Sequence, residues 1–414
     1  MMHLRAATIL LVLLTADPGL ASSGLVPRPA RQEPASGAFT LNARTRIAYT
    51  GEAQPEARLA AAALRPATGF ALPVVPSEDP GRMSNAILFT TEDDPDLGDE
   101  GYRLDVSEPR ITIAAPGSSG RFYGLQTLRQ LLPPEIFAGS PQRADWTVDG
   151  CSIVDGPAFP WRGMMLDVSR YWFTKAFMLR YLDIMAAHKM NVLHWHLIDD
   201  AGWRIEIKGY PRLTEVGAFR GEGDDRYGGY YTQDDIREIV RHAAERGITI
   251  VPEVEIPAHT LAAVVAYPEL CCTGKQMTMP TRHFISEDLY CAGKASTWEF
   301  LETVFEEVCE LFPGTYVHIG GDEARYTRWK ACPDCQQTMK DNGLASEKEL
   351  QGWMTTRIEQ FLAARGKRII GWDEILHCGV SNQAGIMTWH QPKTAVDGAR
   401  QGNPVVMALT GHCY

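Results

Sequence analysis

The chain has 414 residues, more than one average domain contains, so two domains are expected. Hydrophobic residues make up 45% and charged residues 22%, values typical of a globular protein and not of a disordered or fibrous one. The 51 acidic and 40 basic residues give a formal net charge of −11, which disfavours nucleic acid and anionic membranes as partners.

The first residues have the pattern of a secretory signal. His3 and Arg5 precede an apolar run at residues 6–16, which helix-breaking and then small residues follow. This run is too short for an ordinary membrane span, and no later stretch reaches the roughly 18 uncharged apolar residues that a spanning helix needs. We therefore expect residues 1–21 to be a signal peptide and the protein to be exported, either to the periplasm or out of the cell. Residues 22–38, rich in Pro, Ala, Ser and Gly, are expected to be a linker.

Residues 39–155 are expected to form an accessory α+β domain. Turn-bounded, β-rich runs predict strands at 86–90, 101–106 and 111–114. Apolar residues at helical spacing predict a helix at 120–132, which Pro133 ends. This region has no obvious cluster of reactive side chains, so we interpret it as a supporting domain.

From residue 156 onward, strand, loop and helix alternate. The predicted strands are Gly163–Val168, Asn191–Ile198, Thr249–Ile256, Thr315–Ile319, Arg368–Trp372, Gly385–Trp389 and Pro404–Leu409. The predicted helices between them are Thr174–Lys189, Thr232–Arg246, Thr297–Leu311, Glu347–Arg365 and Pro392–Gln401. Such alternation implies parallel strands joined by crossovers. Seven strands are one short of a TIM (β/α)8-type barrel, so residues 156–414 are expected to be a catalytic barrel truncated at its C-terminal end.

Carboxylates follow five of these strands, at the end where TIM barrels carry their reactive groups. They are Asp167, Asp199 with Asp200, Glu253 with Glu255, Asp322 with Glu323, and Asp373 with Glu374. Tryptophans lie near three of the strand ends, and carboxylates beside aromatic rings suit sugars, whose hydroxyls need acceptors and whose C–H faces stack on rings. Two adjacent carboxylates at a buried strand end cost desolvation and repel one another, so the Asp322–Glu323 pair indicates function.

Other residues have structural explanations as well as functional ones. Arg162, at a strand start, can simply pair with a neighbouring carboxylate. His194 and His196 alternate onto one face of a strand, which suits a metal but is more often a satisfied core arrangement. Trp372 and Trp389, taken alone, fit barrel packing better than a sugar platform.

The nine cysteines are an odd number, so in an oxidising compartment at least one is free or pairs between chains. Cys332 and Cys335 form a single CxxC pair with no second pair at metal-ligand spacing. A loop-stapling disulfide is therefore favoured over zinc. Cys272 and Cys291 are able to close a second loop, although spacing alone does not assign the pairing. No metal and no cofactor are expected.

The stretch from Trp161 to Glu374 resembles the β-N-acetylhexosaminidases of glycoside hydrolase family 20. The matching motifs are Arg162-Gly…Leu-Asp167…Arg170, His196-Leu-Ile-Asp-Asp-Ala-Gly-Trp-Arg204, Pro252-Glu253…Pro257-Ala-His259, His318-Ile-Gly-Gly-Asp-Glu323 and Gly371-Trp-Asp-Glu374. The predicted helix at 120–132 is also similar to a segment of that family's accessory domain. Several long motifs in the family's order cover nearly all of the chain after the signal.

The resemblance implies exo-acting hydrolysis of terminal non-reducing β-linked N-acetylglucosamine or N-acetylgalactosamine from glycans or chitooligosaccharides. The family is retaining and substrate-assisted, so the sugar's own acetamido oxygen would attack the anomeric carbon. Asp322 would orient the acetamido group and stabilise the oxazolinium intermediate, and Glu323 would be the general acid and base. Neighbouring side chains of an extended chain point in opposite directions, which would let the two take different tasks. Glu323 would also need a raised pKa. Arg162 would hold ring hydroxyls.

The same resemblance assigns the remaining candidate substrate-binding residues. Asp199 and His259 would form a carboxylate–histidine pair that supports the acid. Trp372 and Trp389 would surround the acetamido methyl, and Tyr414 would hydrogen-bond the acetamido oxygen as it attacks.

The chain departs from the family's pattern with Ala258 in place of a glycine and His390 in place of an arginine, and it lacks the family's residues past the tyrosine. Two other hypotheses remain: a sugar-binding protein on the same scaffold that does not catalyse, and a metal-dependent barrel hydrolase. The second would use His194, His196, His259 and His318, and it alone would lose activity to a chelator. The natural glycan, the linkage, the preferred sugar and the oligomeric state stay open at this level.

Overall fold

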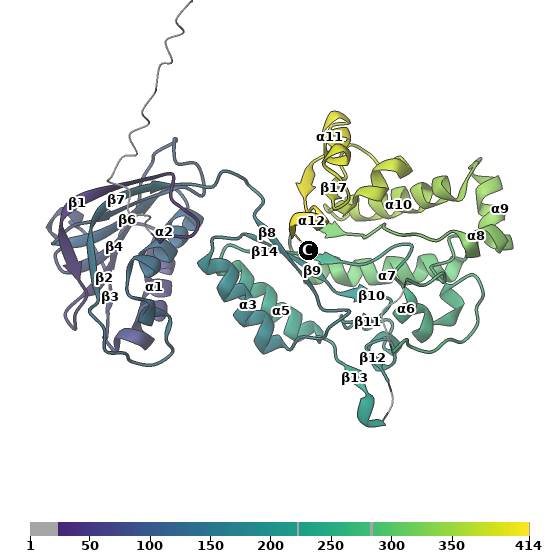
Figure 1. Ribbon diagram of the computed structural model, residues 1–414, viewed down its shortest axis with the longest axis horizontal. Coiled ribbons are helices and arrows are strands. Elements are labelled where there is room, and N and C mark those ends of the chain that lie inside the picture. Colours follow the sequence, from purple (N-terminus) through teal and green to yellow (C-terminus); the bar gives the residue numbers. More distant parts are fainter. Residues whose placement is uncertain (1–23, 222, 282–284, 414) are drawn as a thin grey trace, which may run out of the picture. The chain divides into compact units, whose positions relative to one another are not determined.

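The computed structural model describes residues 24–221, 223–281 and 285–413 (Figure 1). The predicted signal peptide and Tyr414 therefore lie outside the described residues. The chain divides into two compact units, Met1–Pro157 and Ala158–Tyr414. Among the described residues, no helix has both the length and the apolar character needed to span a bilayer.

The first unit contains a seven-stranded mixed sheet with the order β1-β7-β5-β6-β4-β2-β3. Its strands are β1 (Arg31–Thr40), β2 (Arg46–Tyr49), β3 (Val74–Pro76), β4 (Ala86–Thr91), β5 (Tyr102–Val106), β6 (Arg110–Ala115) and β7 (Thr147–Asp155). Helices α1 (Gln54–Thr68) and α2 (Ser118–Leu131) pack against the sheet and against each other (Figure 1). The three strands and the helix that the sequence predicts here are confirmed.

The predicted linker at 22–38 is wrong over its second half, because Arg31–Thr40 forms the edge strand β1. β1 pairs antiparallel with β7, with a shift in register between Pro34 and Ala38. Most of its side chains are exposed, so it lacks the apolar alternation by which a strand is recognised. Its stability comes from backbone hydrogen bonds to β7, and an edge position tolerates the missing N–H of a proline.

The second unit contains a seven-stranded, all-parallel sheet with the order β18-β17-β16-β15-β14-β9-β8, flanked by helices (Figure 1). Its strands are β8 (Gly163–Asp167), β9 (Val192–His196), β14 (Thr249–Glu253), β15 (Tyr316–His318), β16 (Arg368–Trp372), β17 (Gly385–Thr388) and β18 (Val405–Met407). Two short hairpins are formed by β10 (Ile198–Asp199) with β11 (Gly202–Trp203), and by β12 (Phe219–Arg220) with β13 (Tyr227–Gly228). The predicted parallel β/α arrangement and all seven of its strands are confirmed.

The helices of this unit include all five that the sequence predicts and several short ones that it does not. They are α3 (Lys175–Ala187), α4 (Arg212–Glu215), α5 (Gln233–Ala244), α6 (Leu261–Ala266), α7 (Ala295–Leu311), α8 (Thr327–Ala331), α9 (Pro333–Asp341), α10 (Glu347–Ala363), α11 (Pro392–Arg400) and α12 (Thr410–Cys413). Side-chain caps fix three of the long helices at their first residue: Thr174 before α3, a Thr232–Asp235 capping box at α5, and Ser346 before α10.

The register of the parallel sheet aligns four polar residues in one row across neighbouring strands. Asp167 of β8 lies beside His196 of β9, His196 beside Glu253 of β14, and Glu253 beside His318 of β15. Each is the last residue of its strand, so the row marks the carboxyl end of the sheet. Apolar side chains, among them Val192, Val251, Ile370 and Met387, form a buried core in the same sheet.

The expectation of loop-stapling disulfides is wrong for this structure, in which none of the nine cysteines forms a disulfide bond. The cysteines of both expected pairs, Cys332 with Cys335 and Cys272 with Cys291, belong instead to one group of four whose sulfurs lie within 4.8 Å of one another.

Candidate active site

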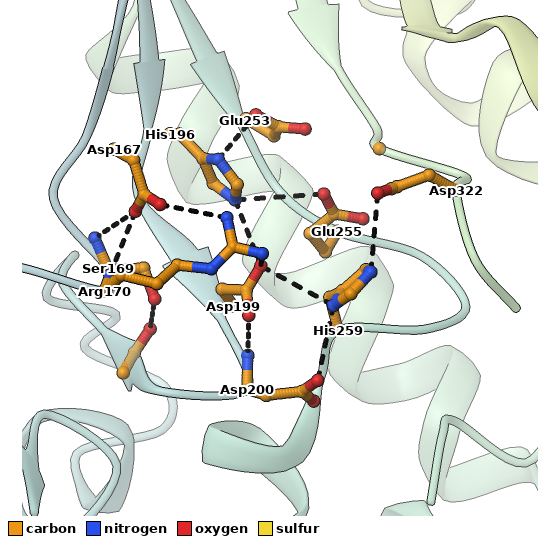
Figure 2. A network of polar contacts seen from close by, with 12 residues as sticks. Asp167, Ser169, Arg170, His196, Asp199, Asp200, Glu253, Glu255, His259 and Asp322 are labelled. Carbon is orange, nitrogen blue, oxygen red and sulfur yellow. Dashed lines mark hydrogen bonds and ion pairs between the residues drawn. The ribbon is translucent and has the colours of Figure 1, made fainter. Parts of the chain in front are cut away.

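The carboxyl end of the parallel sheet carries a connected network of charged side chains (Figure 2). At its centre the Arg170 guanidinium lies between two carboxylates, with its Nη1 atom 2.9 Å from Asp167 Oδ2 and its Nη2 atom 2.7 Å from Asp199 Oδ2. Asp199 is buried, and its salt bridge fixes the guanidinium above the sheet. The planar fork of an arginine held in this way is suited to binding hydroxyl or carboxylate oxygens.

His259 joins two pairs of acidic residues. Its Nδ1 atom lies 3.3 Å from Asp200 Oδ2 and 3.6 Å from Asp199 Oδ2, and its Nε2 atom lies 3.4 Å from Asp322 Oδ2 and 3.3 Å from Glu323 Oε2. Burial opposes its charge, but these four carboxylates outweigh burial and raise the pKa of His259. The imidazole is therefore a cation that both candidate catalytic carboxylates share.

Two glycines allow the chain to turn sharply after β15 and present the acidic pair. Gly320 and Gly321 have φ angles of 61° and 100°, and a Cβ atom on Gly320 would lie 1.6 Å from Glu255 Oε2. Glu323 is itself left-handed, with φ of 50°. This conformation costs a non-glycine residue energy, and such strain concentrates at functional sites.

The predicted divergence of Asp322 and Glu323 is therefore wrong. The positive φ of Glu323 takes the backbone out of the extended form, and both carboxylates converge on His259 Nε2. They differ instead in exposure, since the Asp322 side chain is 15% exposed and that of Glu323 is 37% exposed. Asp322 Oδ1 is buried, and no hydrogen bond reaches it from the described part of the chain. A buried acceptor of this kind is ready for an N–H donor from a ligand.

The expectation of a raised pKa for Glu323 is wrong. The hydrogen bond with His259 lowers the pKa of Glu323, and this effect is larger than the opposing effect of burial. Glu255, fully buried beneath the site, behaves in the opposite way, because burial and the neighbouring Asp322 and Glu253 carboxylates raise its pKa.

Replacing His259 with Asn is expected to move the basic limb of the kcat/KM–pH profile to higher pH. Asn tolerates the left-handed φ of 53° at this position but carries no charge. Since His259 lowers the pKa of Glu323, its removal raises that pKa, and an acid with a higher pKa stays protonated to higher pH. The measurement is kcat/KM against pH for both proteins. A basic limb that stays in place or moves to lower pH would contradict the coupling.

The two predicted wall tryptophans occupy different environments. Trp372 is 3% exposed, and its Nε1 donates a 2.9 Å hydrogen bond to Glu253 Oε1 inside the barrel. Trp389 is partly exposed, and its Nε1 donates to Glu374 Oε2 at 3.0 Å. Of the pair, only Trp389 presents appreciable ring surface among the described residues. Burial raises the pKa of Glu374 to about 7, and the Asp322 carboxylate contributes in the same direction. A cavity of ≈ 460 Å³ lies beside Glu323 and Glu374.

The structure does not bring Arg162 to this site. The residue precedes β8, at the amino end of the sheet, and its guanidinium donates to the backbone carbonyls of Lys189 and Phe159, both at 2.8 Å. The candidate site lies at the opposite end, where Arg170 follows β8. Arg170 therefore replaces Arg162 as the candidate for holding ring hydroxyls, and Arg162 fastens loops at the amino end.

Replacing Arg170 with Lys is expected to lower kcat/KM roughly 10- to 150-fold, because hydrogen bonds to charged groups contribute about 1.5–3 kcal/mol and a lysine cannot reproduce the fork. Arg162→Lys is the matched control and is expected to retain kcat/KM within a few-fold. Steady-state kinetics and thermal melting of both variants separate lost function from lost folding. A larger kinetic loss in folded Arg162→Lys than in Arg170→Lys would contradict the exchange of roles.

A second buried group lies within the barrel, around Glu253. His194 Nε2 lies 2.7 Å from Glu253 Oε2 and His318 Nδ1 lies 2.9 Å from Glu253 Oε1, and the two imidazoles stack with centroids 4.3 Å apart. His196 lies 3.5 Å from both Glu253 and Asp199 and connects this group to the site above it.

The sequence gives no role to three further residues of the site, Asp200, Arg170 and Glu255. Asp200 accepts hydrogen bonds from the backbone N–H groups of Leu261 and Ser286 at 3.1 and 3.2 Å, which holds two loops beside His259. Arg170 and Glu255 lie within the matched motifs, but the resemblance assigns neither of them a role. All three lie just past strand ends, where a barrel carries its reactive groups, but the role of each depends on contacts that only the fold brings about.

Comparisons with known proteins agree with this architecture. The family profile described as "Glycosyl hydrolase family 20, catalytic domain" matches residues 159–414, and "Glycosyl hydrolase family 20, domain 2" matches residues 22–156. A "Beta-hexosaminidase" of Porphyromonas gingivalis is 42% identical over 385 residues, which are 92% of this chain and 49% of the relative. A "Beta-hexosaminidase" of Vibrio furnissii is 35% identical over 94% of this chain and 63% of its own length.

The chain thus spans about half to two thirds of these two curated relatives. Among solved structures, the GH20 β-N-acetylhexosaminidase of Streptomyces coelicolor A3(2) superposes with a TM-score of 0.81 at 34% identity, covering 94% of this chain and 75% of that one. The N-acetyl-β-hexosaminidase of Streptomyces plicatus superposes with a TM-score of 0.80 at 36% identity, covering 93% and 74%. These superpositions confirm the prediction of a TIM-type barrel preceded by a small α+β domain.

Proposed function

The chain belongs to glycosyl hydrolase family 20, and from that premise we propose that it hydrolyses terminal β-linked N-acetylhexosamine from glycans. The observation that carries the proposal is the Asp322–Glu323 pair, whose two carboxylates both lie beside His259 Nε2 at the carboxyl end of the barrel. Family membership supports the class of substrate, an N-acetylated sugar. The geometry supports a division of labour between a buried carboxylate and an exposed one.

In the proposed first step, the acetamido N–H donates to the buried Asp322 carboxylate. The acetamido carbonyl oxygen then attacks the anomeric carbon, and the bond to the leaving oxygen breaks as Glu323 gives that oxygen its proton. The product is a cyclic oxazolinium, and the nearby Asp322 carboxylate stabilises its positive charge.

In the second step, water attacks the anomeric carbon and gives its proton to Glu323. The oxazolinium opens, which restores the acetamido group and the protonated acid. Two inversions at the same carbon give net retention of configuration. His259 takes part by orienting both carboxylates and by favouring the ionised form of Glu323 between the two proton transfers.

We also propose that the protein acts outside the cytoplasm, on N-acetylglucosamine or N-acetylgalactosamine at the non-reducing ends of glycans or chitooligosaccharides. The support is the signal-like pattern of residues 1–21 and the acidic net charge, which suits a neutral sugar better than a polyanion.

The test is hydrolysis of an aryl β-N-acetylglucosaminide by the full chain, beside the matching aryl β-glucoside that lacks the acetamido group. The proposal expects cleavage of the first compound only. It also expects a progressive loss of rate as the acetamido methyl is fluorinated, because fluorine withdraws electron density from the attacking oxygen. Equal cleavage of both glycosides would point to a nucleophile from the protein. Binding of N-acetylglucosamine with cleavage of neither compound would identify a non-catalytic sugar-binding protein.

A further inference from the structure

Four cysteine sulfurs converge at one point of the second unit, away from the carboxylates of the candidate active site. Cys272 Sγ lies 3.7 Å from Cys335 Sγ, and Cys291 Sγ lies 3.6 Å from Cys332 Sγ and 3.5 Å from Cys335 Sγ. All four sulfurs lie within 4.8 Å of one another. From this geometry we propose that Cys272, Cys291, Cys332 and Cys335 bind one structural Zn²⁺ ion as a tetrahedral four-thiolate site.

The sulfur separations fit a metal centre better than covalent pairs. Four sulfurs at about 2.3 Å from a central zinc ion form a tetrahedron with edges of about 3.8 Å. The three distances above are close to that edge and to one another. Two disulfides would instead place each sulfur about 2.05 Å from a single partner. Soft thiolates in a closed tetrahedral set select zinc, which needs no open coordination position for a structural role.

The backbone brings the four sulfurs together from two segments that are distant in sequence. Cys271 and Tyr290 form an antiparallel bridge, and the Cys291 N–H donates to Leu270 O at 2.8 Å, so Cys272 and Cys291 come from one folded loop. Cys332 and Cys335 lie at the first turn of α9. The amino end of a helix stabilises thiolates, because its N–H groups and dipole favour negative charge there.

The two segments fit closely against each other around the cluster. A Cβ atom on Gly293 would lie 2.4 Å from the Asp334 backbone, so only glycine permits this approach. The indole N–H of Trp329 donates to Tyr290 O at 2.9 Å. Lys294 Nζ donates to Cys271 O at 2.6 Å, which places a cation beside the cluster. Four thiolates and one Zn²⁺ ion have a net charge of −2, which this cation partly balances.

Burial and the neighbouring cysteine define which thiols belong to the site. Cys291, Cys332 and Cys335 are buried, and Cys272 is half-buried. Cys271 is also buried, but its sulfur lies 3.4 Å from Pro268 O and 3.2 Å from Thr273 Oγ1, and it is not a member of the group. Cys271 and Cys272 are therefore adjacent residues of which only one is a ligand, and they form a matched pair for a test.

The proposed ion would hold together two segments that follow the candidate catalytic residues along the chain. The segment with Cys272 and Cys291 follows His259 along the chain, and Cys332 lies nine residues after Glu323. The ion would hold these segments together without contacting substrate, so this role is independent of the proposed hydrolysis.

The decisive experiment measures zinc and iron in the full chain, purified without reductant and dialysed against a weak chelator. The proposal expects about one zinc ion per chain, retained in Cys271→Ser and lost in Cys272→Ser. The Cys272→Ser variant should also melt at a lower temperature than Cys271→Ser. Equal zinc contents in the two variants, iron in place of zinc, or no metal in the unmodified chain would overturn the proposal.

A second measurement covers the case in which Cys272→Ser does not fold. The folded, unmodified chain is titrated with a mercurial reagent while a metallochromic dye reports released zinc. The proposal expects the release of about one zinc ion as about four thiols react, one for each thiolate ligand. Non-reducing peptide mapping that finds Cys272 linked to Cys335 and Cys291 linked to Cys332 would show two disulfides and overturn the proposal. Neither readout depends on hydrolysis, so a failure of the proposed function would leave this result unchanged.

Discussion

Replacing Glu323 with Gln is expected to lower kcat/KM about 100- to 10,000-fold on substrates with poor leaving groups. The amide keeps the size of the side chain but cannot donate a proton to the leaving oxygen. Substrates with acidic phenol leaving groups need little protonation, so they should lose far less. The measurement is kcat/KM for a series of aryl β-N-acetylglucosaminides, plotted against the pKa of the released phenol. The dependence should be steeper in the variant than in the unmodified chain.

Glu374→Gln is the matched control, because Glu374 is the other carboxylate beside the cavity and its pKa of about 7 would by itself suit a general acid. Glu374 accepts a hydrogen bond from Trp389 and is expected to position that ring. The loss of kcat/KM in Glu374→Gln should therefore not depend on the leaving group. A steep leaving-group dependence in Glu374→Gln, or a uniform loss in Glu323→Gln, would transfer the role of the acid to Glu374.

Replacing Asp322 with Asn is expected to lower kcat/KM about 100- to 1,000-fold, to a similar extent for good and poor leaving groups. The change removes the negative charge that would stabilise the oxazolinium. In the unmodified chain the buried Oδ1 of Asp322 offers the acetamido group an acceptor. The variant places an amide there instead. The same series of aryl glycosides measures the effect, and it should appear as a parallel downward shift of the whole plot.

Asp373→Asn provides the comparison for Asp322→Asn. Asp373 is a buried carboxylate at the end of the neighbouring strand, and its Oδ1 lies 2.7 Å from His390 Nδ1. The loss of kcat/KM in Asp373→Asn should be smaller, because the Oδ1 atom of Asp373 already faces the His390 imidazole. A loss in Asp322→Asn that grows with the pKa of the leaving group would assign proton transfer to Asp322 instead.

The parallel sheet was predictable because its five central strands, β9, β14, β15, β16 and β17, are largely buried and appear as short apolar runs between loops. The strand β1 was not predictable, because its backbone pairing with β7 holds it in the sheet and its side chains are mostly exposed. Residues 22–38 have the composition of a linker, and composition alone does not predict that part of this segment pairs with the edge of a sheet.

Within the site, adjacency in sequence predicted the Asp322–Glu323 pair but not its geometry. The convergence on His259 depends on a left-handed backbone at Glu323, which no residue pattern predicts for a glutamate. The rule that reactive groups follow strand ends favours Arg170 over Arg162, because only Arg170 lies past the end of β8.

The cysteine cluster illustrates a different limit. Spacing rules identify the CxxC of Cys332 and Cys335, but the other two ligands lie in a loop at least 41 residues earlier in the chain. Only the fold brings Cys272 and Cys291 beside Cys332 and Cys335. The sequence shows a single CxxC pair, which by spacing alone favours a disulfide.

The row formed by Asp167, His196, Glu253 and His318 depends on the register of four neighbouring strands, which affects how refolding of the protein should be measured. A slip of one residue in any of these strands would turn its side chains to the opposite face of the sheet, while leaving the amount of secondary structure almost unchanged. Circular dichroism would count such a misregistered barrel as refolded, whereas hydrolysis would not. Recovery of the proposed hydrolysis would therefore be a stricter test of refolding than circular dichroism, because it requires the native register of all four strands.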